Sequence, residues 1–123
     1  MAIEDNLITL LSSLKYPVFR QGSMSSDAKY PDTFMTFWNS SEAEHSPYDD
    51  DTVIVEYEYM VNVYSNDPDT AYSLLSDARS LLKTNGWIIM SRGYDAASDE
   101  VSHIGRGMIV AYLETLTTNS GGQ

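Results

Sequence analysis

The sequence contains no cysteine, which excludes disulfide bonds, thiol catalysis and thiolate metal sites. It has only seven Lys and Arg residues against eighteen Asp and Glu residues, for a formal net charge of −11. Because affinity for nucleic acid rests on Lys and Arg contacts to phosphates, direct binding of a DNA or RNA backbone is disfavoured. No apolar run approaches the roughly 18 residues of a transmembrane helix.

The first residues lack the basic character of a secretory signal. Residues 1–6 include Glu4 and Asp5 but no Lys or Arg, whereas a signal peptide begins with a positively charged region. We therefore expect a protein that is made and folded in the cytoplasm. Its 123 residues are enough for one domain with a single hydrophobic core.

The acidic excess has three interpretations. The plainest is solubility, because a net charge far from zero keeps proteins apart. The second is electrostatic pairing with a basic surface on a partner. The third is mimicry of nucleic acid, in which carboxylates stand where phosphates would be.

The clearest structural signal is a change of hydrophobic period near residue 65. Residues 52–64 alternate as a strand does, over about twice the usual length of five or six residues. One face of this strand is assigned to the core: Val53, Val55, Tyr57, Tyr59, Val61 and Val63. The opposite face mixes charged, polar and apolar residues: Ile54, Glu56, Glu58, Met60, Asn62 and Tyr64. Such a mixture is typical of a contact surface rather than a plain solvent face.

An amphipathic helix follows this strand. Asp67 is a candidate N-cap with Pro68 at the first helical position, and Asn85-Gly86 supplies a left-handed stop after Thr84. Its apolar residues recur at helical spacing: Ala71, Leu74, Leu75, Ala78, Leu81 and Leu82. We expect the following helix and strand side chains to be buried: Leu74, Leu75, Ala78, Leu81, Val55, Tyr57 and Val61.

The remaining elements complete an α+β fold. The pattern predicts a helix over residues 3–14 ended by Pro17, a short extended exit at Val18 and Phe19, and strands over 33–38, 87–92 and 103–115. The composition predicts polar loops over residues 39–51 and 93–102. It also predicts a single domain over residues 1–116, followed by a flexible tail over 117–123. The expected order is α-β-β-α-β-β. Grouped strands favour a mainly antiparallel sheet of about four strands with two helices packed on one face.

No catalytic, cofactor or metal motif is present. His45 and His103 are expected to be incidental surface residues, and Asp49, Asp50 and Asp51 lack the alternate spacing and glycine of a calcium loop. The Gly105-x-Gly107 pair sits inside a predicted strand, where it indicates a bulge or a place where another backbone packs closely. We therefore expect neither an enzyme nor a cofactor, although a small enzyme using His103 with nearby acids remains an alternative.

Several segments, which together span most of residues 3–115, carry a family resemblance. They are the helix 3–14 with its Tyr16-Pro17-Val18 exit, Tyr30-Pro31 before 33–38, Val61-Asn62-Val63-Tyr64-Ser65 with the helix 67–83, Gly93-Tyr94-Asp95, and His103-Ile104-Gly105-Arg106. Taken together, they resemble the tail-terminator or tail-completion proteins of long-tailed bacteriophages and prophages. The strong acidity of this chain departs from the family pattern.

The resemblance implies a structural virion protein without catalytic residues. Such proteins form rings, commonly hexamers, that cap the tail tube and meet a head-completion ring, with DNA passing through the lumen. The expected localisation is the virion, after assembly in the host cytoplasm. The alternative is an acidic DNA-mimic inhibitor or regulator.

The residues expected at contacts between subunits or with the tail tube come from the acidic loop, the mixed strand face and the Gly93 region. They are Glu42, Glu44, Asp49, Asp50, Asp51, Met60, Tyr64, Arg92, Asp95 and Arg106. Arg92 and Arg106 are the expected basic partners for acids such as Asp95, within one chain or across a subunit boundary.

Overall fold

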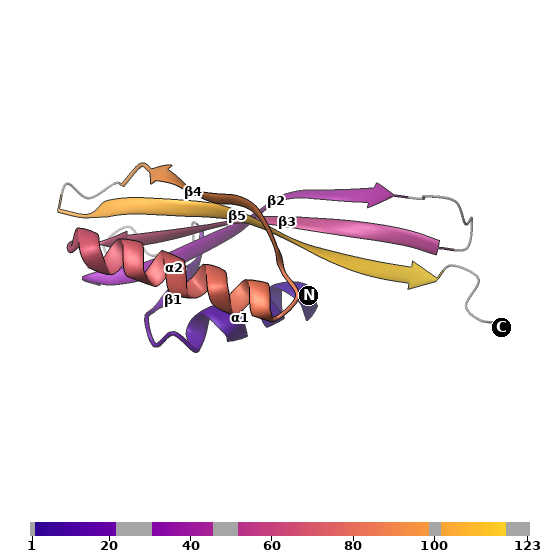
Figure 1. Ribbon diagram of the computed structural model, residues 1–123, viewed down its shortest axis with the longest axis horizontal. Coiled ribbons are helices and arrows are strands. Elements are labelled where there is room, and N and C mark those ends of the chain that lie inside the picture. The colour runs from indigo at the N-terminus through magenta and orange to yellow at the C-terminus, as the bar shows by residue number, and fades with distance from the viewer. Residues whose placement is uncertain (1, 22–30, 46–51, 99–101, 118–123) are drawn as a thin grey trace.

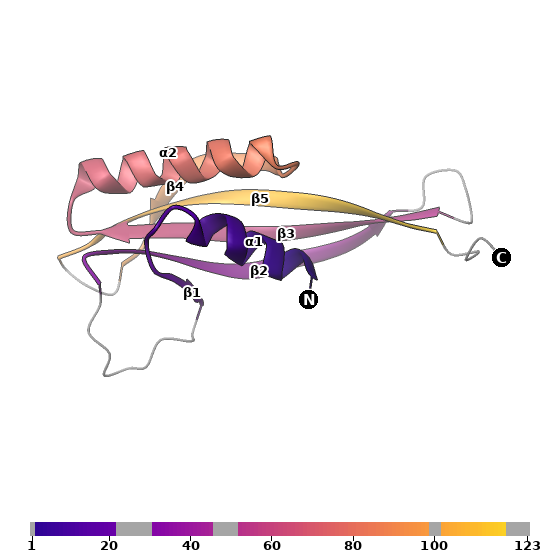
Figure 2. The same cartoon turned by 90° about the horizontal axis from the view of Figure 1, so that it is seen from below.

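The computed structural model describes residues 2–21, 31–45, 52–98 and 102–117 (Figure 1). In chain order the elements are α1 (Ala2–Ser12), β1 (Val18–Arg20), β2 (Thr33–His45), β3 (Thr52–Ser65), α2 (Pro68–Thr84), β4 (Ile88–Ala96) and β5 (Ile104–Thr117). The strands form one sheet in the order β1-β2-β3-β5-β4. Both helices cover the same face, α2 over β3, β5 and β4, and α1 beside it (Figure 2). Neither helix in the described part is long and apolar enough to cross a membrane.

The predicted α+β class and the placement of both helices on one face are confirmed, but the sheet differs in detail. It has five strands rather than about four, because the short exit at Val18 and Phe19 is a true edge strand. β1 pairs in parallel with β2, whereas the other three pairings are antiparallel. The sheet is therefore mixed, although mainly antiparallel.

The ends of α2 follow from local chemistry and confirm the prediction. Asp67 is extended at φ −118° and ψ 112°, and its carboxylate accepts hydrogen bonds from the Asp69 backbone N–H at 3.2 Å and the Thr70 hydroxyl at 2.9 Å. Pro68 follows within the first turn. At the other end Gly86 has φ +92°, a conformation that favours glycine and stops the helix after Thr84.

The predicted end of α1 is wrong by about half a turn. The helix stops at Ser12 rather than Leu14, well before Pro17. The Ser13 hydroxyl donates to the Leu10 carbonyl at 2.6 Å, which offers the backbone an alternative to another helical turn, and Lys15 is left-handed at φ +71°. The carbonyl of Pro17 instead accepts a hydrogen bond from the Met35 N–H at 2.9 Å and so leads the chain into β1.

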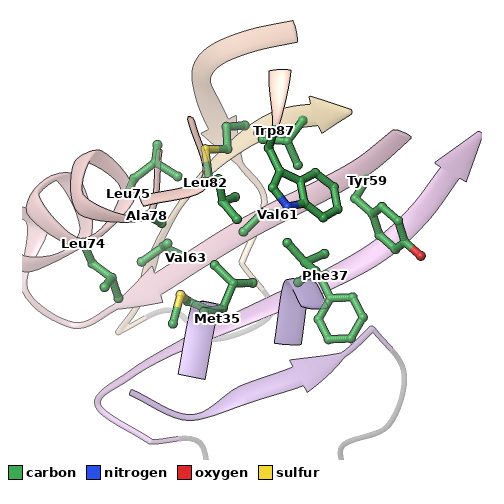
Figure 3. Close-up of a cluster of buried hydrophobic side chains, with 14 of the residues drawn as sticks. Met35, Phe37, Tyr59, Val61, Val63, Leu74, Leu75, Ala78, Leu82 and Trp87 are labelled. Atoms are coloured by element: carbon green, nitrogen blue, oxygen red, sulfur yellow. The ribbon is translucent and has the colours of Figure 1, made fainter. Parts of the chain in front are cut away.

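The core lies between the helices and one face of the sheet (Figure 3). Tyr59, Val61 and Val63 of β3 are fully buried, and Trp87 packs edge-on to Tyr59 with ring centroids 6.0 Å apart. The buried residues of α2 are Ala71, Leu74, Leu75, Ala78 and Leu82. The odd-numbered face of β3 is therefore the core face, as its period predicts.

Three residues that were predicted to be buried are only partly so. Val55 and Tyr57 lie on the core face of β3 but towards its outer end, and Leu81 lies at the margin of the α2 face while Leu82 is fully buried. Successive helical residues are rotated by about 100°, so the choice between Leu81 and Leu82 depends on where the helix rests on the sheet.

Both predicted loops are partly strand. Residues 39–45 continue β2, because they pair with β3 from Asn39 opposite Tyr59 to His45 opposite Ile54, with a register shift between Asn39 and Ser41. Residues 93–96 likewise belong to β4. β5 includes Thr117, which had been assigned to the tail. The rest of the acidic loop (46–51), residues 99–101 and the tail from 118 on lie outside the described residues.

Replacing Leu82 with Ala is expected to lower the free energy of unfolding by about 2–5 kcal/mol, because the side chain is 0 % exposed. Leu81→Ala is the matched control, with the same change at the adjacent position of the same helix. It should cost clearly less, because Leu81 is already partly exposed. Urea denaturation of both variants measures the difference. Equal costs, or a larger cost at Leu81, would contradict this assignment of the helix face.

Tyr59 links the core to α1. Its hydroxyl donates to Oε1 of Glu4 at 3.2 Å, and Glu4 also pairs with Arg20 of β1. Burial of the hydroxyl, and then the nearby Glu4 carboxylate, raise the pKa of Tyr59 to about 12 from the ordinary value of 10.0.

This pKa predicts a loss of stability in alkali. Between pH 10 and about 12 the unfolded tyrosine loses its proton while the folded one keeps it, so the unfolded state binds fewer protons and stability falls as pH rises. Tyr59→Phe should cost about 1 kcal/mol at neutral pH by removing the hydrogen bond. The variant should also lose stability less steeply over this pH window, as urea denaturation at several pH values would show. An unchanged slope would mean that Tyr59 does not titrate in this way.

Candidate assembly interface

The outer ends of three strands form an arm that projects beyond the helices (Figures 1 and 2). We define the arm as residues 41–45 of β2, 52–58 of β3 and 112–117 of β5. The ladders hold these segments together, with Val55 of β3 opposite both Glu44 of β2 and Glu114 of β5. Of the arm side chains whose exposure is described, none is buried. Tyr57 and Tyr112, at the inner end of the arm, still pack against the core of the molecule, and the rest of the arm extends past it.

The arm carries five carboxylates and no Lys or Arg. Cross-strand partners share a face of a sheet, so the registers place each carboxylate on one side or the other. Glu42, Glu44 and Glu114 lie opposite Tyr57 or Val55 and share the face that the helices cover further along. Glu56 and Glu58 lie on the opposite face. We call these the helix-side and helix-free faces of the arm.

Several arm side chains are held in place by neighbours. The Tyr57 hydroxyl donates to Oε1 of Glu114 at 3.0 Å, and this hydrogen bond is the main reason that the pKa of Tyr57 is raised. The Ser40 hydroxyl donates to Oε2 of Glu58 at 2.8 Å, and Nε2 of His45 lies 3.4 Å from Oε1 of Glu56. Glu42 and Glu44 are both exposed on β2.

Of the acids that were predicted for the interface, Glu42 and Glu44 are thus on the arm. Their neighbours Asp49, Asp50 and Asp51 lie outside the described residues. The structure therefore assigns a place to only part of the acidic segment.

Met60 and Tyr64 lie on the helix-free face of the main sheet. The Tyr64 ring stacks on Phe34 with centroids 5.2 Å apart and planes at 26°. Met60 is opposite Trp38 of β2 and Ile109 of β5, and Trp38 is 38 % exposed. The predicted pair therefore belongs to an aromatic and apolar surface that no helix of the described chain covers.

The two glycines of β5 make room for side chains on this face. A Cβ atom on Gly107 would lie 2.3 Å from Oδ1 of Asn62 and 2.6 Å from the Tyr94 ring, and one on Gly105 would lie 2.8 Å from the Tyr64 ring. The predicted close approach of another backbone is seen at Gly105, where a Cβ atom would lie 2.6 Å from the Ala96 carbonyl oxygen, whereas the groups closest to Gly107 are side chains. β5 pairs with β3 here without a register shift, so no bulge separates these two strands.

Replacing Gly107 with Ala is expected to lower the free energy of unfolding by about 1–3 kcal/mol, because Asn62 and the Tyr94 ring must both move. Alanine is intrinsically at least as acceptable as glycine within a strand, so a destabilisation must come from crowding. Thermal or urea denaturation measures it. An unchanged or higher stability would show that the helix-free face is packed more loosely than described.

Arg106 and Asp95 pair with each other inside one chain. Nη1 of Arg106 donates to Oδ1 of Asp95 at 2.9 Å, and the guanidinium lies 5.0 Å from the centre of the Tyr72 ring on α2. Of the two alternatives left open by the sequence, the pairing within one chain is the one observed. The Arg106 side chain is mostly covered, so it is poorly placed to meet an acid from another subunit.

Arg92 is exposed and belongs to a cationic groove between α2 and β4. The groove has a volume of about 450 Å³ and is lined by Ser76, Arg79, Ser80, Lys83, Ile89, Met90 and Arg92. Nη1 of Arg79 donates to the Arg92 backbone carbonyl at 2.9 Å. Burial, then repulsion from Arg92 and Arg106, lower the pKa of Arg79. Within the described chain, no carboxylate forms an ion pair with Arg79, Lys83 or Arg92.

Sequence reasoning missed this groove. Arg79 and Lys83 are four residues apart on α2, which places them on one helix face. That spacing was the available signal, but their approach to Arg92 depends on how α2 packs beside β4.

The two histidines lie in different parts of the fold, His45 on the arm and His103 just before β5. Nε2 of His103 lies 2.8 Å from the Pro31 carbonyl, and its ring lies 6.0 Å from that of Phe34. His103 therefore joins two parts of the fold and is more than an incidental surface residue. No group of three or more His, Asp or Glu residues that could hold a metal ion occurs among the residues that the structure describes.

A comparison of the sequence with protein-family models, and another with curated proteins, find no match.

Proposed function

We propose that this protein is a structural subunit of a ring in the tail of a long-tailed bacteriophage or prophage, as a tail terminator or tail-completion protein. The proposal combines the sequence resemblance with surfaces that suit assembly. The ring, which we propose is a hexamer, would contact the tail-tube protein on one side and a head-completion protein on the other. DNA would pass through its lumen, and the protein would reside in the virion after assembly in the host cytoplasm.

The observation that carries the proposal is the arm. Three hydrogen-bonded strands extend past the helices with no described side chain buried, yet they expose apolar residues such as Leu113 and Leu116 at 45 % and 43 %. Its apolar side chains are only partly buried within their own chain, so part of their apolar area stays in water. The arm is well suited to contacting other subunits, which could cover apolar residues that it leaves in water.

The helix-free face of the sheet supports the same role. Trp38, Met60 and Tyr64 form part of an aromatic and apolar surface on a sheet whose other face is already covered by α1 and α2. Thr36 and Asn62 are each 8 % exposed on this face, and their side-chain oxygens have no hydrogen-bond partner among the described residues. A structural subunit uses such surfaces for contacts and needs no catalytic residues.

The alternative function is an acidic DNA-mimic inhibitor or regulator. The specific observation in its favour is that both faces of the arm carry carboxylates with no cation among them. A mimic would bind a basic DNA-binding protein as a monomer or dimer, and DNA would compete for that protein. A ring protein would instead run far above the 13.8 kDa of one chain.

Disrupting the reading frame in the phage or prophage that carries it tests the proposal. We expect filled heads and tails to accumulate separately, with tails of uncontrolled length in electron micrographs, because the tail tube is neither capped nor joined. Supplying the intact protein from a second copy should restore joined particles. Joined particles with normal tails in the disrupted strain would rule the proposal out, and DNA-competed binding to a basic protein would favour the mimic.

A further inference from the structure

The charges of the molecule are separated between two surfaces. The arm carries five carboxylates and no cation, whereas Arg79, Lys83 and Arg92 gather in the groove between α2 and β4. The three cations lack a carboxylate partner within the described chain, and repulsion from Arg92 and Arg106 acts on Arg79. The groove is therefore suited to receive an anionic surface.

The apolar character of the two surfaces also matches. Met90 and Ile89 line the groove beside the cations, and Met90 is 52 % exposed. The helix-side face of the arm carries Leu116 beside Val53, and Leu116 is 43 % exposed. Contact between the two would bury apolar area together with the charge pairs, which is the usual composition of a specific interface.

The arm cannot fill the groove of its own chain. β3 pairs without a break with β5 from Thr52 to Ser65, so the arm is a continuous extension of the sheet. It projects away from the part of the sheet that α2 covers (Figures 1 and 2). An arm-to-groove contact must therefore join two copies.

Such a contact has a consequence for symmetry. The arm and the groove are different surfaces, so the contact is head-to-tail and leaves one free arm and one free groove on every pair. Repetition of a head-to-tail contact closes into a ring when the rotation allows it, and otherwise gives an open filament.

We propose that the helix-side face of the arm, with Glu42, Glu44 and Glu114, docks into the groove of Arg79, Lys83 and Arg92 on the next copy of this chain. This inference rests on the proposed function, because it names the contact that builds the ring. The groove could instead attract a polyanion such as DNA, but the net charge of −11 opposes the approach of one. A second copy supplies the anionic surface at close range.

Two pairs of substitutions test the arm. Glu42→Gln with Glu44→Gln removes two charges from the helix-side face, and both side chains are exposed. Glu56→Gln with Glu58→Gln removes two charges from the opposite face of the same arm and is the matched control. Light scattering after size exclusion over a range of concentrations should show at least about tenfold weaker association for the first pair only. Added salt should also weaken the self-association of the intact protein, because it screens the charge pairs.

Mixing two defective chains gives a sharper test. A chain with Glu42→Gln and Glu44→Gln keeps its groove, and a chain with Lys83→Gln and Arg92→Gln keeps its arm. Neither should build rings alone. Their mixture should form one-to-one pairs of about twice 13.8 kDa, because only one intact arm and one intact groove remain to meet. Lys15→Gln, which removes an exposed cation far along the chain from the groove residues, should assemble as the intact protein does.

The inference is overturned if the variant with Glu42→Gln and Glu44→Gln assembles like the intact protein, or if the association of both arm variants is weakened equally. It is overturned as well if the mixture of the two defective chains stays monomeric. It is also overturned if the intact chain stays monomeric with and without tail tubes. Binding of a short DNA duplex that depends on Lys83 and Arg92 would assign the groove to a polyanion instead. These failures are distinct from failure of the proposed function, which would appear as normal joined particles when the protein is absent.

Discussion

The long central strand β3 is the constraint on which the rest of the structure depends. It runs from Thr52 to Ser65 and pairs along this length with β5 on one side, and with β2 as far as His45 opposite Ile54 on the other. Backbone N–H and C=O groups that are not hydrogen-bonded are costly when they are removed from water. Two equally long neighbours satisfy those groups, and the sheet therefore extends well past the helices that cover its other end.

This length divides the molecule into two parts. Where α1 and α2 lie on the sheet, β3 contributes the fully buried Tyr59, Val61 and Val63 to the core. Towards the arm the same odd-numbered face continues through Tyr57, which packs at the margin of the core, and then Val55. Both stay partly exposed and have carboxylates beside them. One hydrophobic pattern thus produces a core at one end and a partly exposed surface flanked by carboxylates at the other. The positive charges that could pair with those carboxylates lie in the groove between α2 and β4, away from the arm of the same chain. The proposed contact therefore joins two copies.

The sequence was sufficient for the elements whose signals are local. The N-cap at Asp67, the stop at Gly86 and the core face of β3 each follow from a few neighbouring residues. The extension of β2 through residues 39–45 could not be read from its composition, because Ser, Glu and His resemble a loop and the strand is set by pairing with β3. A strand as long as β3 needs equally long partners, and that requirement was the one usable signal.

The candidate site divides in the same way. Glu42 and Glu44 are exposed, and Met60 and Tyr64 are half-buried on the helix-free face, whereas Arg106 turns inward to Asp95 and Tyr72. Gly93 lies beside the guanidinium, where a Cβ atom would lie 2.8 Å from Nη2 of Arg106. The grouping of Arg79 and Lys83 with Arg92 depends on the packing of a helix against an edge strand, which a single sequence does not specify.

The absence of cysteine allows a direct measurement of the proposed contact, because any introduced pair of thiols can be interpreted without background. A chain carrying Glu44→Cys on the arm and Met90→Cys in the groove can form a disulfide only where the two Cα atoms come within about 7 Å. Mild oxidation of the assembled protein should give a ladder of covalent multimers that ends at one closed size. The same experiment with Glu58→Cys in place of Glu44→Cys should leave monomers. Monomers alone from the Glu44→Cys chain, or equal ladders from both, would contradict the head-to-tail contact of arm and groove.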